Sequence, residues 1–390
     1  MKCPLRVLHI VSGDLWAGAE VQAFTLISHL AKMPDIEVAV ALMNEGTLAQ
    51  KLRAIDIPIW ITDEKTANSL RIFIRLRGVL RSWRPDLIHT HREKENILGS
   101  LANRSCRNVS SVRTVHGGGE HEGAMGWRGT RHKIVTGVDR WCGRTLQQRV
   151  IAVSSDLGRR LARQFPPEKV IVIENGVDIE AVRAAQGIAD FRRAEPQFVH
   201  VGIVGRLVKV KRVDLFIETA ALLQRRESQR NWRFHVFGDG PLRAELERLS
   251  EGAALADRIR FHGHRHDIAT CIAGLDALVI CSDHEGLPMA ALEAAALEVP
   301  TVAHAVGGLI DVVPEAFLVA QHDAQGYRGG ILRTLQQDAR AMARNHAWES
   351  LQKFSASRNA ERIRSVYEQV IAEWHAIGDK HDARLKTDDH

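Results

Sequence analysis

The stretch that decides the fold lies near the N-terminus and reads Leu5-Arg6-Val7-Leu8-His9-Ile10-Val11-Ser12-Gly13-Asp14. Its apolar residues 5–11 predict a strand, and the glycine that follows them predicts a turn. Apolar residues then recur with helical spacing through residues 19–32. Strand, glycine turn and helix together form the repeating unit of a parallel α/β sheet.

The same unit recurs along the chain. In the first half, apolar runs alternate with helical segments such as 70–83, and the runs occupy residues 36–43, 57–61, 87–89, 112–115 and 150–153. A polar stretch without pattern follows, and the apolar runs then resume at residues 198–204, 234–237, 259–262, 277–281 and 301–303. The alternation predicts an α/β protein with two Rossmann-like, doubly wound domains.

The pattern also predicts where the domains begin and end. We expect an N-terminal domain at 1–180, a linker at 181–196 and a C-terminal domain at 197–355. A helical segment at about 356–377 is a candidate to pack back on the first domain, and the charged end, 378–390, is expected to be disordered. Ligands of such sheets bind beyond the carboxyl ends of the strands, so we expect the active site in a cleft between the domains.

Composition excludes several classes of protein. The 390 residues are 45% hydrophobic and 26% charged, which is typical of ordinary folded chains. The five cysteines are scattered and form no Cys-x-x-Cys pair, so we expect reduced thiols. No secretory leader and no apolar stretch of about 18 residues is evident. We therefore expect a cytoplasmic protein, with the inner face of the cytoplasmic membrane as the alternative location.

The positive charge is concentrated in one part of the chain. The net charge is +6, whereas residues 69–149 carry 16 basic against 6 acidic side chains. Nucleic acid is not expected as a partner, because no aromatic interleaving, zinc spacing or known binding module accompanies the charge. The basic residues are either solvated helix faces or a surface for anionic lipid.

We favour the lipid surface because basic and apolar residues are interleaved in two segments. In 70–83, four arginines (Arg71, Arg75, Arg77, Arg81) lie between apolar residues at helical spacing (Leu70, Phe73, Ile74, Leu76, Leu80, Trp83). The charge recurs around two tryptophans, Trp127 and Trp141, at Arg128, Arg131, Lys133, Arg140 and Arg144.

The sharpest group of candidate site residues follows the apolar run 277–281. It reads Ser282-Asp283-His284-Glu285-Gly286-Leu287-Pro288-Met289-Ala290-Ala291-Leu292-Glu293. Pro288 suits the first turn of a helix, whose free amides make an anion site. Glu285 precedes that turn and Glu293 lies inside the helix, so two carboxylates can reach two parts of one ligand. The alternative is that Glu285 only stabilises the start of its helix electrostatically and that Glu293 is an ordinary surface glutamate.

A second group follows the run 198–204. A turn at Gly205 brings Arg206 and Lys211 to the carboxyl end of the strand, where two cations suit a diphosphate. A structural network of ion pairs is the alternative. Gly238 and Gly263 mark two other strand ends where a nucleobase could approach the backbone.

Together these motifs resemble the ordered signature of the retaining GT-B glycosyltransferases of family 4. The motifs of the second half are Asn175-Gly176-Val177-Asp178, Gly205-Arg206-Leu207 with Lys211, Gly238-Asp239-Gly240-Pro241, Glu285 with Glu293, and Gly307-Gly308. Those of the first half are Ala17-Gly18-Ala19-Glu20, Asp86-Leu87-Ile88-His89-Thr90-His91 and Thr114-Val115-His116. The resemblance covers about residues 5–308.

The resemblance implies a role for each matched residue. The catalytic set would be Arg206 and Lys211 on the donor diphosphate, Glu285 on sugar hydroxyls, and His116 beside the transferred sugar. Glu293 would bind the ribose, and the other donor-binding positions would be Gly13, Gly18, Gly205, Gly263, Gly286, Leu287, Pro288 and Met289. His116 as a core histidine and Gly18 as a plain turn remain open alternatives.

The chain departs from the family pattern at three positions. Ala17 replaces the first glycine of a pair, and Arg212 and Glu298 stand where the family has glycine. A glycine at the last position normally serves as a left-handed helix cap, so we expect Glu298 to alter helix termination. Ala17 bears on the acceptor-side loop, and Arg212 either adds a phosphate contact or only surface charge.

The activity that the resemblance implies is retaining, hexosyltransferase-type transfer from a nucleotide-diphosphate sugar. UDP-sugar is the first choice of donor and GDP-mannose the second. The acceptor would be a bacterial-type glycan or a lipid-linked acceptor in cell-surface polysaccharide or lipopolysaccharide synthesis. The alternatives are a catalytically silent nucleotide-sugar sensor or scaffold, and a sugar isomerase or phosphorylase of the same fold.

We expect no metal and no cofactor in this reaction. The sequence has no Asp-x-Asp pair to hold Mg²⁺, and cationic side chains at the predicted site can take its place. His262, His264 and His266 alternate at a strand end, and we do not expect them to bind a metal.

Overall fold

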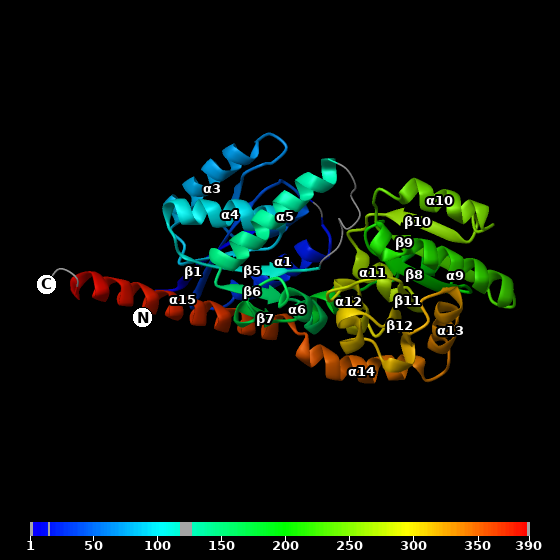
Figure 1. Ribbon diagram of the computed structural model, residues 1–390. Helices are drawn as coiled ribbons and strands as arrows, with labels where there is room; N and C mark the ends of the chain where they lie inside the picture. Colours follow the sequence, from blue (N-terminus) through cyan, green and yellow to red (C-terminus); the bar gives the residue numbers. More distant parts are fainter. Residues whose placement is uncertain (1–2, 15, 118–126, 388–390) are drawn as a thin grey trace. The chain divides into compact units, whose positions relative to one another are not determined.

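A computed structural model describes residues 3–14, 16–117 and 127–387 of the chain (Figure 1). The chain divides into two compact units. Unit 1 contains most of the chain up to residue 176 together with the C-terminal residues from 356, and unit 2 consists mainly of residues 177–355.

Unit 1 is built on a parallel sheet of seven strands in the order β3-β2-β1-β4-β5-β6-β7. The strands are β1 (Leu5–Val11), β2 (Ile36–Leu42), β3 (Ile59–Ile61), β4 (Leu87–Thr90), β5 (Ser110–Val115), β6 (Arg149–Ala152) and β7 (Val170–Val172). The central strand β1 is buried almost throughout, as expected of a strand covered on both faces.

Helices cover both faces of this sheet. Val7 and Val11 of β1 pack with α1 (Gly18–Leu30), α2 (Thr47–Arg53) and α15 (Ala356–Thr387), while Leu8 and Ile10 pack with α3 (Ser69–Trp83) and α4 (Glu93–Cys106). Successive strand residues point to opposite faces, which explains this division. α5 (Trp127–Thr145) contacts α4, and α6 (Ser155–Leu161) packs on β6 and β7.

Unit 2 has a parallel sheet of six strands in the order β10-β9-β8-β11-β12-β13. The strands are β8 (Val199–Val204), β9 (Trp232–Phe237), β10 (Ile259–Gly263), β11 (Ala277–Ile280), β12 (Thr301–His304) and β13 (Leu318–Val319). One core joins the sheet to α9 (Val213–Arg226), α10 (Arg243–Gly252) and α13 (Ala324–Thr334). α12 (Met289–Ala296) contacts both α11 (Ile268–Ala273) and α14 (Ala339–Lys353). The prediction of an α/β protein with two Rossmann-like domains is confirmed.

The segment predicted as a linker, 181–196, is not a linker without structure. It overlaps α7 (Ile179–Ala184), whose N-terminus is capped by the Asp178 side chain, and contains α8 (Asp190–Ala194). Phe191 of α8 is buried, with its ring 4.1 Å from that of His235. A single aromatic residue in a polar stretch therefore anchors this segment to the sheet.

The C-terminal end also differs from the expectation. The helix that starts at Ala356 contributes Ala360, Ile363 and Val370 to the core of unit 1. It continues to Thr387, so the backbone of residues 378–387 is helical rather than disordered. Residues 388–390 lie outside the described part.

The apolar stripe of α3 has a different register from the predicted one. Its buried residues are Ile72, Leu76, Val79, Leu80 and Trp83. Leu70 and Ile74, which belong to the apolar spacing noted in the sequence, are exposed. Among the helices in the described residues, none is both long enough and apolar enough to cross a bilayer.

Candidate functional site

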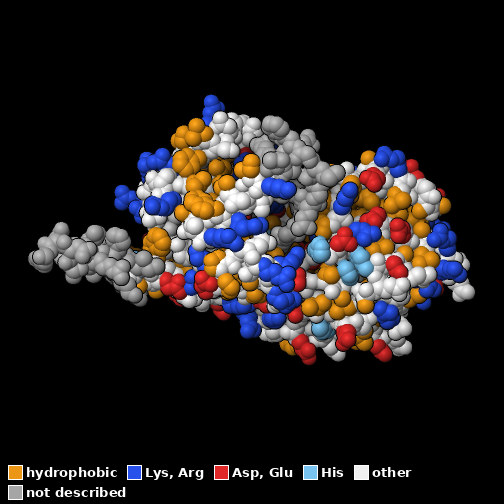
Figure 2. Space-filling view, in the orientation of Figure 1, with side chains coloured by type: hydrophobic (Ala, Val, Ile, Leu, Met, Phe, Trp, Pro, Cys, Tyr) orange, Lys and Arg blue, Asp and Glu red, His pale blue; other side chains and the backbone are white. Residues whose placement is uncertain are grey.

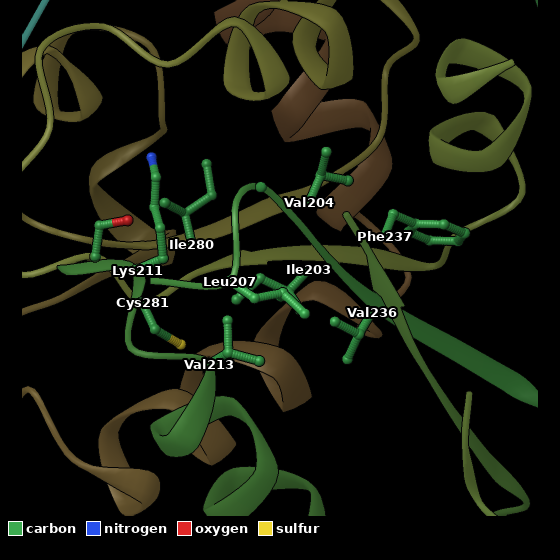
Figure 3. A pocket seen from close by; sticks show the side chains of 11 residues that line it. Ile203, Val204, Leu207, Lys211, Val213, Val236, Phe237, Ile280 and Cys281 are labelled. Atoms are coloured by element: carbon green, nitrogen blue, oxygen red, sulfur yellow. The ribbon is translucent and has the colours of Figure 1, made fainter. Parts of the chain in front are cut away.

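A small pocket with an empty volume of about 250 Å³ lies at the carboxyl ends of β8, β9 and β11. Its walls include the backbone of Gly205 and the side chain of Lys211. Figure 3 shows the Lys211 side chain extending away from the apolar side chains of Leu207 and Val213. The pocket thus has an apolar floor and a cationic group at its rim.

Glycines allow two strand ends to meet at this pocket. A Cβ atom on Gly238 would lie 1.9 Å from the carbonyl oxygen of Gly205, so only glycine fits there. The Gly238 N–H donates a hydrogen bond of 2.7 Å to the carbonyl of Gly263, which has a φ of +66°. These backbone contacts shape the strand ends that the sequence marked for a nucleobase.

The structure brings Lys211 and Glu285 together. Lys211 Nζ lies 2.6 Å from Glu285 Oε1, and the Ser282 hydroxyl donates to the same oxygen at 2.5 Å. Glu285 is buried, and Lys211 is three-quarters buried. An anionic ligand at the rim would compete with Glu285 for the ammonium group. Arg206 follows Gly205 in the turn, and its side chain is exposed.

The Gly307-Gly308 motif supports the loop that carries Glu285. Gly307 has a φ of +58°, and a Cβ atom there would lie 2.0 Å from the carbonyl oxygen of Glu285. The Gly308 N–H donates to the carbonyl of Gly286 at 2.6 Å. Two glycines some twenty residues away therefore fix the backbone at the predicted sugar-binding glutamate.

The helix after this loop begins one residue later than expected. Pro288 has extended backbone angles and is the N-cap residue of α12, which starts at Met289. Glu293 lies about one turn inside the helix, and burial raises its pKa to about 7. Within the described part of the chain, no hydrogen bond to its carboxyl group is found. A buried carboxyl group of this kind, one turn into the helix that follows the Glu285 loop, is a candidate ligand-binding group.

Two of the departures from the family pattern occupy left-handed backbone positions. Arg212 has a φ of +48° and Glu298 a φ of +59°. Arg212 lies 3.3 Å from Asp283 and 3.0 Å from Asp214. The expectation that Glu298 alters helix termination is wrong, because Glu298 itself adopts the left-handed conformation that glycine normally supplies. Ala17 is the N-cap residue of α1 and provides no side-chain hydrogen bond.

Gly13 and Gly18, the two glycines of the first half predicted to bind the donor, differ in how much room the structure leaves for a side chain. Gly13 has a φ of +80°, and a Cβ atom there would lie 3.2 Å from the carbonyl oxygen of Asn44. Gly18 opens α1 and has open space around it. A side chain would therefore be strained at Gly13, whereas Gly18 has room for one.

Sequence reasoning missed a charged group at the carboxyl edge of the unit 1 sheet. Arg92 lies 3.3 Å from Asp14 and also pairs with buried Glu20. Burial raises the pKa of Glu20 to about 6 and that of Glu95 to about 7. The available signal was the acidic first turns of α1 and α4, the helices that follow the neighbouring strands β1 and β4.

His116 follows β5 at the same edge of unit 1. Its Nε2 atom lies 3.2 Å from Nδ1 of His91. Its Nδ1 atom is buried without a hydrogen-bond partner among the described residues. Burial lowers the pKa of His116 to about 3, so its ring is neutral at neutral pH.

Comparison with known proteins identifies the family. Residues 199–337 match the model of the glycosyl transferases group 1, and residues 16–181 match that of glycosyltransferase family 4. A UDP-Gal:alpha-D-GlcNAc-diphosphoundecaprenol alpha-1,3-galactosyltransferase of Escherichia coli is 24% identical over 389 residues, covering 94% of this chain and 97% of that protein.

Solved structures share the fold. HepE of Anabaena, in a complex with UDP-glucose, superposes with a TM-score of 0.79 at 20% identity over 94% of this chain and 100% of its own. The lipopolysaccharide outer core galactosyltransferase WaaB has a TM-score of 0.66 at 16% identity, with coverage of 94% and 100%. With matching family models in both halves and the GT-B fold, the chain belongs to the group 1, family 4 glycosyltransferases.

Proposed function

We propose that this glycosyltransferase moves a hexose from a UDP-sugar to a glycan or lipid-linked acceptor, with retention of the anomeric configuration and without a metal ion. The observation that carries the proposal is the pair between Lys211 and the buried Glu285 at 2.6 Å. It lies on a glycine-shaped strand end, the place where parallel sheets bind nucleotides.

Each half of the donor has a group suited to it in unit 2. Lys211 and Arg206 bind the diphosphate, and the free amides at the start of α12 add a helix N-terminus. Glu285 binds sugar hydroxyls, and the buried carboxyl group of Glu293 binds the ribose hydroxyls. His116 contacts the transferred sugar, as the family resemblance implies.

Retention follows from attack on the same face of the sugar. The acceptor oxygen bonds to the anomeric carbon as the bond to the leaving phosphate breaks, and that phosphate takes the acceptor proton. No protein nucleophile is required by this path. Lys211, Arg206 and the α12 amides stabilise the charge that develops on the leaving diphosphate.

The charged groups at the proposed diphosphate site support a metal-independent reaction. Mg²⁺ in such enzymes bridges phosphates and is held by carboxylates, whereas the charged side chain that lines the pocket is that of Lys211, which pairs with Glu285. Activity should therefore survive an excess of EDTA. Complete loss of activity, restored by Mg²⁺ or Mn²⁺, would contradict this part of the proposal.

The relatives guide the choice of substrates. The E. coli relative is named for UDP-galactose and a diphosphoundecaprenol acceptor, and WaaB for the lipopolysaccharide outer core. UDP-sugars are therefore the first donors to test and GDP-mannose the second. Lipid-linked acceptors of polysaccharide or lipopolysaccharide synthesis are the first acceptors to test.

A surface of unit 1 supports a membrane-bound acceptor. Ile134, Val138 and Trp141 lie at helical spacing on α5, and Ile134 and Trp141 are 63% and 50% exposed. Figure 2 shows hydrophobic and basic side chains interspersed in the part of the view where α3 and α5 lie. The side chains of Trp127, Arg128 and Arg131, which were expected to belong to this surface, are outside the described part. We propose that this surface binds anionic lipid at the inner face of the cytoplasmic membrane.

Sedimentation with vesicles tests the lipid surface. Vesicles rich in anionic lipid should bind the protein at low salt, and binding should weaken at high salt. Replacing Ile134 and Trp141 together by serine should reduce binding about tenfold. Trp348→Ser is the control, because Trp348 is 68% exposed on α14 of unit 2. Equal, negligible binding to anionic and neutral vesicles would contradict the surface.

A panel of nucleotide sugars tests the function itself. A donor that binds only the folded protein at 100 times its Kd should stabilise it by about 2.7 kcal/mol. The stabilising donor should then support transfer, or slow hydrolysis, with the sugar retaining its configuration. Binding without any turnover would indicate a sensor, whereas rearrangement of the sugar without an acceptor, or transfer of the sugar to inorganic phosphate, would indicate an isomerase or a phosphorylase.

A further inference from the structure

One face of the unit 1 sheet carries a row of polar side chains in its core. His9 of β1 pairs directly with His89 of β4, His91 and His116 follow β4 and β5, and Tyr367 comes from α15. His9, His89 and Tyr367 have no exposed surface. Such groups are costly to bury unless each finds a partner.

Hydrogen bonds join these side chains end to end. Thr114 Oγ1 lies 2.8 Å from His89 Nε2, and His89 Nδ1 lies 2.6 Å from Tyr367 Oη. Tyr367 Oη is 3.4 Å from His9 Nε2, and His9 Nδ1 is 3.0 Å from His91 Nε2. His91 Nδ1 is 3.2 Å from His116 Nε2. These six side chains, from Thr114 to His116, are called the histidine chain below.

The links of the histidine chain are coupled because its imidazoles are neutral. Burial lowers the pKa of His9 to about 3 and holds those of His89 and His91 well below the ordinary value. A neutral imidazole has one N–H and one lone pair. A histidine that donates on one side must therefore accept on the other, and the direction of one link sets the direction of the next.

Both ends of the chain reach the same pocket. Thr114, His91 and His116 are among the residues that line a pocket with an empty volume of about 230 Å³. In one direction His116 Nδ1 presents a lone pair, and the Thr114 hydroxyl is free to donate. In the other direction Nδ1 carries a proton, and Thr114 offers only lone pairs. In either direction, the histidine chain therefore presents one hydrogen-bond donor and one hydrogen-bond acceptor to the pocket.

Physical chemistry selects the resting direction. In the described part of the chain, His116 Nδ1 has no partner. Each direction leaves one hydrogen-bond donor without a partner, either the N–H at His116 Nδ1, whose direction is fixed by the ring, or the Thr114 hydroxyl, whose proton can rotate toward an acceptor. The direction that leaves a lone pair on His116 Nδ1 is therefore favoured. All four histidines then carry their proton on Nε2, and Thr114 donates into the pocket.

We propose that the histidine chain makes His116 Nδ1 and Thr114 Oγ1 a coupled acceptor and donor that bind a hydroxyl group of the donor sugar. His9, His89, His91 and Tyr367 are positioning residues, because they act only through these two. The proposal rests on the proposed function, which supplies the sugar. A hydroxyl fits because it donates to one group and accepts from the other.

A metal site is the competing explanation for the same residues. One nitrogen each of His9, His89 and His91 lie within 4.8 Å of one another. However, all six ring nitrogens of these histidines already have a hydrogen-bonding neighbour in the chain. A metal ion would have to displace several of those bonds.

Nitrogen NMR of the full-length protein labelled with ¹⁵N-histidine tests the chain without any turnover. Two-bond couplings distinguish the two tautomers, and single substitutions assign the signals. We expect the Nε2–H tautomer at His9, His89, His91 and His116 in the free protein. A proton on Nδ1 of His116, a mixture of tautomers along the chain, or stoichiometric zinc in protein purified without chelator would overturn the proposal.

Coupling across the chain is tested with Thr114→Val. This change removes the acceptor of His89 Nε2–H, so either direction leaves one N–H unpaired and His116 should become a mixture of tautomers. Adding Tyr367→Phe interrupts the chain, and Thr114→Val should then have no further effect on His116. Thr219→Val, at a buried threonine of unit 2, is the matched control and should leave all four tautomers unchanged. An unchanged His116 in Thr114→Val would contradict the coupling.

Kinetics test the hydroxyl. Thr114→Val should raise the KM for UDP-sugar about tenfold with kcat nearly unchanged, as expected when a substrate contact is lost equally in ground and transition states. An unchanged KM in the folded variant would refute the sugar contact. If the wild type neither binds nor turns over a nucleotide sugar, the proposed function fails. The NMR measurement of the tautomers then tests the coupling within the histidine chain on its own.

Discussion

A row of hydrogen-bonded histidines crosses each of the two sheets, but the rows end on different groups. In unit 2, His262 Nε2 lies 2.9 Å from His235 Nδ1, and His235 Nε2 lies 2.9 Å from His200 Nδ1. His200 Nε2 lies 2.9 Å from the carbonyl oxygen of Glu195. In unit 1, the row ends on the Thr114 hydroxyl.

The ends decide whether a row can reverse. A backbone carbonyl only accepts, so His200 must donate from Nε2, and the two histidines behind it must do the same. A hydroxyl can donate or accept, so the unit 1 row has two allowed directions. The unit 2 row is therefore fixed, and its histidines provide an internal reference for the NMR measurement on unit 1.

The carboxyl edges of the two sheets differ in charge as well. The edge of unit 2 has the Lys211–Glu285 pair beside the start of α12, which suits a diphosphate. The edge of unit 1 has the ion pairs of Arg92 with Asp14 and Glu20, but the row of histidines that reaches this edge at His116 is neutral, which suits hydroxyl groups. The same parallel architecture thus supports two kinds of recognition, and the following changes test that contrast.

The largest effect is expected from Lys211→Ala. Loss of the ammonium group should cost about 2–4 kcal/mol of transition-state stabilisation, by analogy with lost oxyanion donors, and kcat/KM should fall accordingly. Steady-state kinetics with the preferred donor measure this. Lys209→Ala, at an exposed lysine in the same turn, is the control. Arg206→Ala should also lower kcat/KM. Wild-type turnover by folded Lys211→Ala would contradict the assignment of Lys211 to the diphosphate.

The next largest effect is expected on the pH dependence of stability, when the buried carboxyl group of Glu293 in unit 2 or of Glu95 in unit 1 is replaced. The pKa of Glu293 is raised to about 7 in the folded protein, from 4.5, so its ionisation opposes folding. The wild type should lose stability relative to Glu293→Gln as pH rises from about 5 to 8, by up to about 3 kcal/mol. Glu95→Gln in unit 1 should show the same sign, because the pKa of Glu95 is also raised to about 7.

Denaturant unfolding at several pH values measures these differences. Below about pH 4.5 both carboxyl groups are protonated in the folded and unfolded chains, so no difference of this origin remains. A stability difference that does not change between pH 5 and 8 would show that burial does not perturb these groups.

The smallest effect concerns left-handed backbone positions. Unit 1 keeps glycine at Gly13, whereas unit 2 has Glu298 at a φ of +59°. Glu298→Gly should stabilise the protein by about 0.5–1 kcal/mol, because relief of the left-handed strain exceeds the entropy lost by glycine. The two ion pairs lost, with Arg183 at 3.6 Å and with Arg344 at 4.0 Å, join partly exposed side chains and contribute little. Gly13→Ala should destabilise, and a loss of stability in Glu298→Gly would break the contrast.

Much of the fold could be predicted because strong apolar runs mark buried parallel strands. The predicted run 5–11 coincides with β1, and the runs in the second half fall on β8 to β12. The strands β7 and β13 were missed because they have only three and two residues. Helix α8 was missed because one buried aromatic, Phe191, holds it in place, and a single residue has no periodicity.

The site was predictable where backbone geometry demands a residue type. Gly238 and Gly307 belong to motifs that the sequence singled out, and the structure shows that no other residue fits their contacts. The histidine chain could not be predicted, since it joins residues from β1, β4, β5 and α15 that are up to 358 positions apart. Only the folded sheet brings such residues into one row.

Calorimetric titration with UDP alone tests the central claim most directly, because UDP carries the diphosphate but no sugar. The account predicts that Lys211→Ala weakens UDP binding at least tenfold, whereas Thr114→Val leaves it within about twofold of the wild type. Equal affinity of Lys211→Ala and wild type for UDP, or a loss confined to Thr114→Val, would contradict the assignment of the diphosphate to unit 2.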